Sequence, residues 1–333
     1  MYPGARKNSP PDLPQDTRWF ATLRRGWLWL IVIFGLGFIV ISLLKNHEIL
    51  AQKFTFSLAF FIATVASYLV YWVVACALWQ RLLCWLLRVR VSFGEAFLQL
   101  TLVSIGKYVP GKVWGMAARG SYLQQHAVDW RSSTLATVVE QTAILHSAVV
   151  HSLCVAGLLE NGSSRGHLFL TTAVLTLLLG VAIHRPFVRA ATKTLQHARH
   201  AAPAEFTVTL SALNYFFLVC GFLLVWTLIG TVFAGLYFTC FGAKLELDLW
   251  LVLILSNTVG ITAGFLALFA PGGIGIREGV GSAILSGYLP VADAISVCVL
   301  FRFWTVTVEF VIAVIVFSLV GLKAKRSIGK RSI

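Results

Sequence analysis

Long apolar runs alternate with short polar stretches along almost the whole chain. Six of these runs meet or approach the roughly 20 residues that an α-helix needs to cross a bilayer. They are residues 27–44, 54–79, 132–159, 168–183, 206–243 and 294–320. Runs of this length indicate helices rather than strands. The pattern predicts an all-α polytopic membrane protein with about six to eight transmembrane helices.

Two further apolar stretches are each followed by a Pro-Gly motif. Residues 93–106 lead into GKYVPGKVWG at 106–115, and residues 249–269 lead into APGGIGIREG at 270–279. Proline and glycine interrupt a helix, and backbone groups freed inside a membrane must be buried in protein or line a wet cavity. We therefore expect two broken re-entrant hairpins. The alternative is that 249–269 and 280–293 are two complete crossings.

Composition and charge agree with this class and orient the chain. The sequence is 58% hydrophobic and 12% charged, with a formal net charge of +14. Segments 1–26, 80–131, 184–205 and 323–333 carry five, seven, four and five Lys/Arg, whereas loops 45–53, 160–167 and 243–248 carry two, one and one. This alternation predicts a multi-pass protein of the inner (cytoplasmic) membrane with both termini in the cytoplasm. Anionic lipid headgroups, not nucleic acid, are the expected partners of the basic charge.

The same topology predicts that the two hairpins open toward opposite sides of the membrane. Their prolines, Pro110 and Pro271, lie about half a chain apart, which suggests inverted repeats of the kind found in many transporters. We expect three segments along the chain, a disordered N-terminus at 1–20, a membrane domain at 21–322 and a basic tail at 323–333. Within the membrane domain we expect a surface helix in 184–205 and a break in the span 206–243 near Gly230 or Gly235.

The first motif carries charge on both sides of its break. Lys107 and Lys112 flank Pro110 and Gly111, and Arg119 follows at helical spacing. Glycine lets backbone N–H groups approach a phosphate, and lysine adds positive charge. Lys107, Pro110, Gly111 and Lys112 are therefore candidate lipid-binding residues. The alternative is that the lysines are snorkelling anchors at the membrane surface.

The second motif places Arg277 and Glu278 among the glycines Gly272, Gly273 and Gly275. So many glycines predict an unusual backbone, and two charges within a membrane need partners or water. All five residues are candidates for substrate binding. The alternative is a local salt-bridged loop at the membrane interface.

Three further charges, Glu140, Arg302 and Glu309, lie inside predicted spans, where ionisable residues are expected to be functional. We predict that Glu140 and Arg302 pair across helices, with Glu309 as the other candidate partner of Arg302. His146 and His151 are expected to be hydrogen-bonded core residues rather than metal ligands. The sequence contains no catalytic constellation, so we expect neither enzyme activity nor a cofactor or metal.

Residues 106–114 and 271–279 resemble two motifs of the lysylphosphatidylglycerol synthase transmembrane-region family, and Glu140 and Arg302 also match its pattern. The resemblance covers roughly residues 20–320. It implies a flippase-like membrane domain without the soluble domain that synthesises aminoacylated lipid. It also implies that a glycosyltransferase or another lipid-synthesis enzyme is a candidate partner.

These observations support the hypothesis of a lipid translocase that moves or binds a phospholipid or a lipid-linked headgroup. In this hypothesis Lys107, Lys112 and Arg277 hold the phosphate, and Glu140, Glu278 and Arg302 tune the cavity. Two alternatives stay open. One is a proton-coupled transporter of a small polar solute that uses Glu140 or Glu278, and the other is a non-catalytic accessory subunit of a membrane glycosyltransferase.

Overall fold

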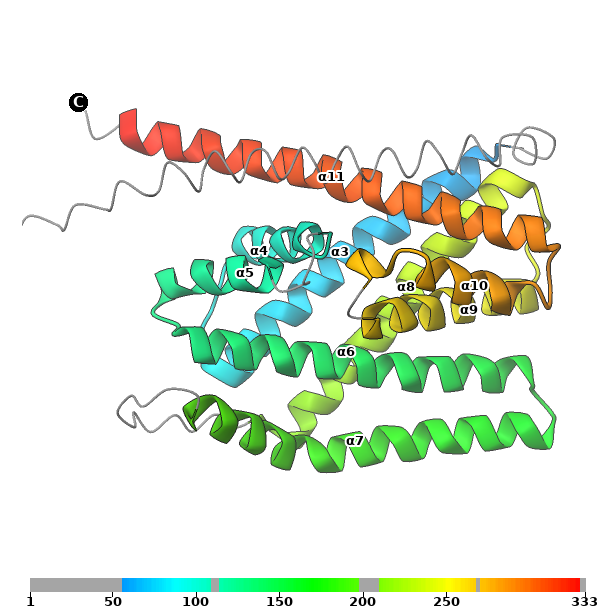
Figure 1. The fold of residues 1–333 in the computed structure, drawn as a ribbon, viewed down its shortest axis with the longest axis horizontal. Coiled ribbons are helices and arrows are strands. Elements are labelled where there is room, and N and C mark those ends of the chain that lie inside the picture. The colour runs from blue at the N-terminus through cyan, green and yellow to red at the C-terminus, as the bar shows by residue number, and fades with distance from the viewer. Residues whose placement is uncertain (1–55, 109–113, 198–209, 268–269, 330–333) are drawn as a thin grey trace, which may run out of the picture. The chain divides into compact units, whose positions relative to one another are not determined.

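The computed structural model describes residues 56–108, 114–197, 210–267 and 270–329, which all belong to one compact unit, Asn46–Ile333. These residues form nine α-helices and no strand, which confirms the predicted all-α class (Figure 1). The α-helices are α3 (Leu58–Leu87), α4 (Phe93–Gly106), α5 (Trp114–Leu123), α6 (Trp130–Leu159), α7 (Ser164–His197), α8 (Ala212–Phe241), α9 (Leu247–Leu266), α10 (Ile276–Leu285) and α11 (Val291–Gly329). Two short 3₁₀ turns, η1 (Gln124–His126) and η2 (Pro271–Gly273), complete the described structure.

Six of the described helices, α3, α6, α7, α8, α9 and α11, are long and apolar enough to cross a membrane. The predicted span at 27–44 and the N-terminal segment 1–20 lie outside the described residues. Helix α10 has ten residues and is therefore only about 15 Å long, half the thickness of the hydrocarbon core. The alternative in which 280–293 crosses the membrane is thus wrong.

Two local predictions were also wrong. The basic segment after residue 183 is not a separate surface helix, because α7 continues without interruption through Pro186 to His197. Helix α8 has no break at Gly230 or Gly235, since it is continuous from Ala212 to Phe241. These two glycines instead allow close packing, where added methyl groups would collide with Ile254 and Thr64.

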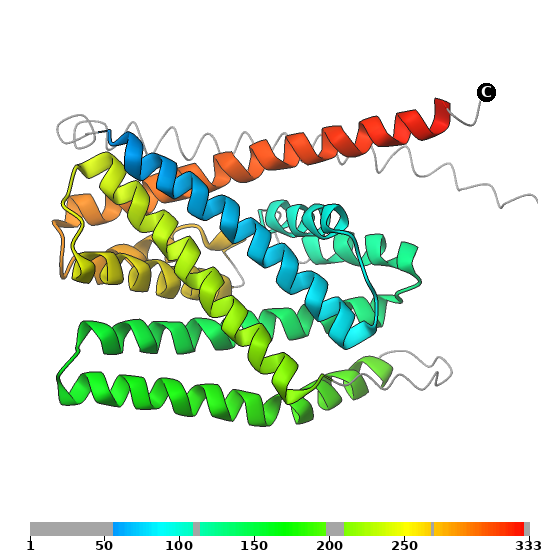
Figure 2. The same cartoon turned by 180° about the vertical axis from the view of Figure 1, so that it is seen from behind.

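The long helices pack in antiparallel pairs, α3 against α8 and α6 against α7 (Figures 1 and 2). Between them lie two helical hairpins, α4–α5 and α9–α10. The first hairpin begins where α3 ends and leads into α6, whereas the second begins where α8 ends and leads into α11. The hairpins therefore open toward opposite ends of the bundle, as inverted repeats require.

The α4–α5 hairpin is fixed at both of its ends. Ser92 and Glu95 form a reciprocal capping box at the start of α4, and the hydrogen bond from the Ser92 backbone N–H holds the pKa of Glu95 below its usual range. At the turn, Gly106 lies directly against Gly115, so that a side chain at Gly106 would collide with the backbone of α5. The two helices can approach this closely only because both residues lack a side chain.

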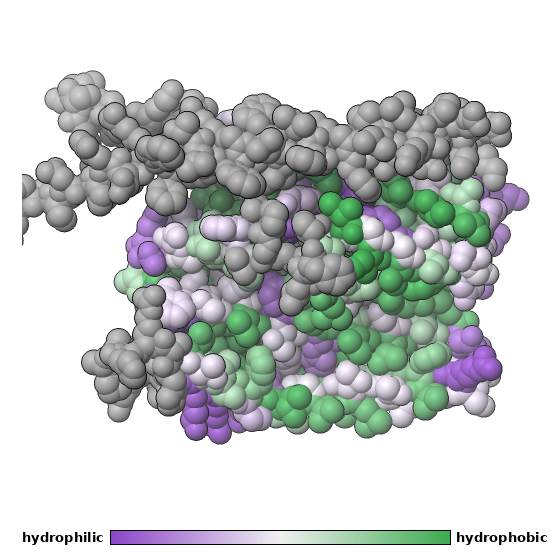
Figure 3. Space-filling view, viewed as in Figure 1, coloured by the Kyte–Doolittle hydropathy of each residue, from purple (hydrophilic) through white to green (hydrophobic). Residues whose placement is uncertain are grey.

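The side of the molecule formed by α7 exposes large apolar side chains. Leu168, Leu175, Leu178 and Leu179 are each at least 60% exposed. Figure 3 shows an apolar surface over this helix with polar residues gathered toward both of its ends. This distribution is expected of a helix that faces lipid.

We expect Gly106→Ala to destabilise the protein, because the added methyl group must separate α4 from α5. Overpacking of this kind typically costs about 1–3 kcal/mol. Thermal unfolding of the purified protein in detergent measures the effect. Gly94→Ala is the matched control, since nothing lies within 4 Å of a methyl group there. Equal unfolding temperatures of the two variants would contradict the close contact.

Candidate central charge cluster

The turns of the two hairpins meet in the interior of the bundle. A methyl group added at Gly272, in the second hairpin, would lie 3.4 Å from the ring of Tyr108, in the first. Helix α11 passes both turns and supplies Arg302 and Glu309. The two motifs that lie half a chain apart in the sequence therefore form one site.

The first hairpin contacts this site through a lysine and a tyrosine. Lys107 Nζ lies 2.6 Å from Glu309 Oε1, and the Tyr108 hydroxyl donates to Glu309 Oε2 at 2.9 Å. Glu309 is 7% exposed, so its carboxylate is removed from solvent and each oxygen has one donor. The side chain of Lys107 is 37% exposed, which leaves one side of the ammonium open.

The glycines of the second hairpin adopt a left-handed backbone conformation that residues with side chains rarely adopt. Gly272, Gly273 and Gly275 have φ values of 59°, 72° and 84°, in the region that favours glycine. This confirms the predicted unusual backbone. A side chain at Gly272 would collide with Arg302, and one at Gly273 would collide with Gly264 of α9. The turn therefore brings its backbone directly against the charged residues.

Arg277, Glu278 and Arg302 lie beside this turn with incomplete pairing. Glu278 Oε2 accepts the Gly275 backbone N–H at 2.7 Å, whereas Glu278 Oε1 is 3.9 Å from Arg302 Nε, too far for a hydrogen bond. Arg277 donates to Asn257 Oδ1 at 3.5 Å and its guanidinium lies 4.8 Å from the centre of the Phe301 ring. Arg302 is 5% exposed, and its guanidinium carbon lies 5.3 Å from the centre of the Tyr108 ring.

We call Lys107, Arg277, Glu278, Arg302 and Glu309 the central cluster. It holds three cations and two carboxylates, and so has one cation in excess. Arg302 Nη2 and Asn257 Nδ2 are buried donors with no hydrogen-bond partner among the described residues. Unsatisfied buried donors are costly, and an anion would satisfy both the donors and the charge. The adjoining cavity, between Asn257 and Arg277, is only about 10 Å³, enough for water alone.

Glu140 does not belong to this cluster, and the predicted Glu140–Arg302 pair is wrong. Glu140 forms an ion pair with Arg119 of α5, and both side chains are buried. The Arg119 guanidinium also lies 3.8 Å from the centre of the Trp79 ring, whose indole N–H donates to Gln99 at 2.8 Å. The other candidate partner of Arg302, Glu309, is paired with Lys107 and Tyr108.

The structure thus brings together most of the residues that the sequence indicated. Six of these residues lie at the hairpin turns, namely Lys107, Gly272, Gly273, Gly275, Arg277 and Glu278. Two more, Arg302 and Glu309, lie beside the turns on α11. Pro110, Gly111 and Lys112 lie outside the described residues. Sequence reasoning missed the roles of Tyr108, Trp79 and Gln99, although Tyr108 lies within the first motif.

The two histidines are hydrogen-bonded core residues, as predicted. His146 contacts the Tyr215 hydroxyl at 3.2 Å and the Thr176 carbonyl at 3.1 Å. His151 lies between the hydroxyls of Thr227 and Thr258. Within the described part of the chain, no group of three His, Cys, Asp or Glu side chains could hold a metal ion.

Comparison with known protein families places most of the chain in one family. Residues 22–314 match the family described as the lysylphosphatidylglycerol synthase TM region. The chain belongs to this family. The match spans both hairpins and the helices around them, so all five residues of the central cluster lie within the matched region. No curated protein matches the chain.

We expect Glu140 and Arg119 to be energetically coupled. Removing either charge strands the other in the core and typically costs about 3–5 kcal/mol, so Glu140→Gln and Arg119→Gln should each lower the unfolding temperature, and the double variant should fall short of their sum. A double-mutant cycle in detergent measures the coupling. Glu140→Gln with Arg302→Gln is the control cycle and should be additive within about 0.5 kcal/mol. Coupling in the control cycle alone would restore the pair that the structure excludes.

We also expect Gly273→Val to damage the protein more than Gly287→Val. Gly273 has a positive φ and lies against the backbone of Gly264, whereas the nearest atom to a methyl group at Gly287 is 3.6 Å away. The yield of monodisperse protein after purification compares the two. Similar yields would show that the turn tolerates a side chain.

Proposed function

We propose that this membrane protein binds the phosphate of a phospholipid or lipid-linked headgroup at the central cluster and moves it across the membrane. The observation that carries the proposal is the excess of one cation over carboxylates at the point where two oppositely opening hairpins meet. A phosphodiester supplies one negative charge and acceptor oxygens for the unpartnered donors of Arg302 and Asn257.

The part that each cation plays in binding the phosphate follows from its ion-pair partner in the structure. Arg277 forms no ion pair with a described residue, and Arg302 lies 3.9 Å from Glu278 without a hydrogen bond. Both guanidinium groups suit the geometry of a phosphate. Lys107 is held by Glu309 in this structure, and an arriving phosphate competes with that carboxylate for it. The acyl chains stay outside, on the apolar surfaces of the bundle. No covalent step is involved, and the chain acts as a carrier rather than an enzyme.

The arrangement of the hairpins supports alternating access. The cavity beside Arg277 holds only about 10 Å³, so a headgroup must enter by displacement of one hairpin. Displacement of α4–α5 opens the cluster to one end of the bundle and displacement of α9–α10 opens it to the other. By the positive-inside rule, the end that carries Arg88, Arg90 and Arg131 faces the cytoplasm. We propose on this basis that the protein lies in the cytoplasmic membrane with both termini inside.

We expect Arg277→Gln to slow headgroup translocation about ten- to hundredfold, the equivalent of one hydrogen bond to a charged group. The purified protein is reconstituted into liposomes with headgroup-labelled anionic or zwitterionic phospholipids, and loss of label on the inner leaflet is followed with an impermeant quencher. Arg165→Gln is the control, because Arg165 is exposed and distant in sequence from both motifs.

The same liposomes distinguish the alternatives. Translocation of no lipid in the panel, together with uptake of a small solute driven by a pH gradient, would establish the proton-coupled transporter instead. Failure of both activities, with stable co-purification of a glycosyltransferase, would establish the accessory subunit. An unchanged rate in Arg277→Gln would remove the central cluster from the mechanism.

A further inference from the structure

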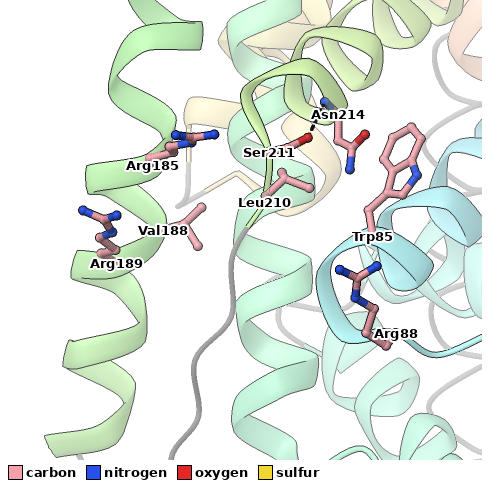
Figure 4. Close-up of a pocket in the computed structure, with 8 residues that line it drawn as sticks. All are labelled: Trp85, Arg88, Arg185, Val188, Arg189, Leu210, Ser211 and Asn214. Atoms are coloured by element: carbon pink, nitrogen blue, oxygen red, sulfur yellow. Dashed lines mark hydrogen bonds between the residues drawn. The ribbon is translucent and has the colours of Figure 1, made fainter.

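A second basic site lies apart from the central cluster, at the end of the bundle where α3 and α7 end and α8 begins. Here a pocket of about 330 Å³ opens between the three helices (Figure 4). Its polar lining comes from all three, with Arg88 at the end of α3, Arg185 and Arg189 on α7, and Ser211 and Asn214 at the start of α8. Trp85, Val188 and Leu210 form the apolar wall. We call this the arginine pocket.

The arginine pocket has three positive charges and no carboxylate in its lining. None of Arg88, Arg185 and Arg189 forms an ion pair with a described residue. The intervening segment 198–209, which lies outside the described residues, contains one carboxylate in its sequence, Glu205. One carboxylate cannot neutralise three guanidinium groups. Figure 4 shows Arg185 and Arg189 on α7 and Arg88 on the opposite side of the pocket. A guanidinium group suits the geometry of a phosphate, and excess positive charge around the pocket favours an anion.

Other groups in the pocket add to this preference. The Ser211 hydroxyl caps α8 by accepting the backbone N–H of Asn214 at 3.1 Å. The half-buried amide of Asn214 makes no side-chain hydrogen bond among the described residues, and Figure 4 shows it beside Trp85 above Arg88. Arg88 itself has a φ of 58° at the end of α3, a position that glycine usually fills. An arginine thus occupies a position where the backbone conformation alone would favour glycine.

Exposed apolar side chains accompany the pocket residues along α7 and α8. Ile183 and Phe187 of α7 are 52% and 38% exposed, and Leu213 and Phe217 of α8 are 62% and 52% exposed. All four are within four residues of a pocket residue along the same helix. A group of phosphate-binding donors beside exposed apolar helix faces suits a ligand with a charged head and acyl chains.

We propose that the arginine pocket binds the phosphate group of an anionic phospholipid. The ligand is held at the membrane surface, and its acyl chains lie along α7 and α8. This site is distinct from the central cluster, and its occupancy does not depend on translocation.

Lipid retention by the intact purified protein tests the proposal. Native mass spectrometry or lipid titration compares phosphatidylglycerol with phosphatidylcholine of the same acyl chains, and a thermal-shift titration with inorganic phosphate tests a soluble ligand. The pocket variant combines Arg88→Gln, Arg185→Gln and Arg189→Gln. We expect its affinity for phosphatidylglycerol to fall at least about tenfold, since each basic residue near a lipid surface contributes substantially to the free energy of binding anionic lipid.

The control variant removes the same charge elsewhere, with Arg81→Gln, Arg165→Gln and Lys244→Gln, three exposed residues that do not line the pocket. It should retain lipid as the unchanged protein does. Both triple variants are also made with Arg277→Gln, so that lipid held at the central cluster does not contribute. This background separates failure of the pocket from failure of the proposed function.

Each result of the lipid-binding and phosphate-binding measurements either supports or overturns the proposal. Loss of phosphatidylglycerol from the pocket variant alone supports a lipid site. Loss of inorganic phosphate binding alone keeps the phosphate site but overturns the lipid as its source. Equal binding by the pocket and control variants overturns the proposal. If the triple variant does not fold, Arg185→Gln and Arg88→Gln singly should each weaken binding about threefold, and no change in either would likewise overturn it.

Discussion

The contact between the two hairpin turns is the constraint on which the rest of this structure depends. A bundle of apolar helices does not accommodate charges unless they find partners, and here the partners come from segments far apart in the chain. Tyr108 lies against Gly272, and a side chain at this glycine would collide with Arg302. Lys107 of the first hairpin pairs with Glu309 of α11, and Glu278 of the second hairpin lies 3.9 Å from Arg302 of α11. The two hairpin turns thus meet each other and the charges of α11 at one place.

The central cluster and the Arg119–Glu140 pair show two ways in which this protein holds buried charge. Arg119 and Glu140 are matched one to one and enclosed by Trp79, which indicates a structural role in attaching α5 to α6. The central cluster is unmatched, partly open, and built on irregular backbone. In a balanced and enclosed pair each charge depends on the other, so that removal of one partner is costly, whereas an unbalanced group retains attraction for a ligand.

Much of the fold could be predicted because each span is a continuous apolar run and each hairpin contains a Pro-Gly break. The glycines around Arg277 likewise predicted an irregular backbone. The partner of Glu140 could not be found in this way, since the sequence does not specify which faces of the helices meet. Arg119 follows the first motif at helical spacing, and the sequence does not indicate that α5 turns it toward Glu140. The arginine pocket escaped prediction for the same reason, because Arg88 and Arg185 are almost a hundred residues apart and meet only through packing.

Helix α11 carries Arg302 and Glu309 seven residues apart, a separation of about 10.5 Å along one face. Arg302 lies toward the second hairpin and Glu309 binds the first, so a single helix contacts both hairpins. A displacement of α11 that relieves one contact must strain or reshape the other. In the proposed transport cycle, α11 therefore links the two hairpins in free energy in addition to the ligand that both contact. The stiffness of this one helix disfavours simultaneous opening at both ends, which would let ions leak through the membrane.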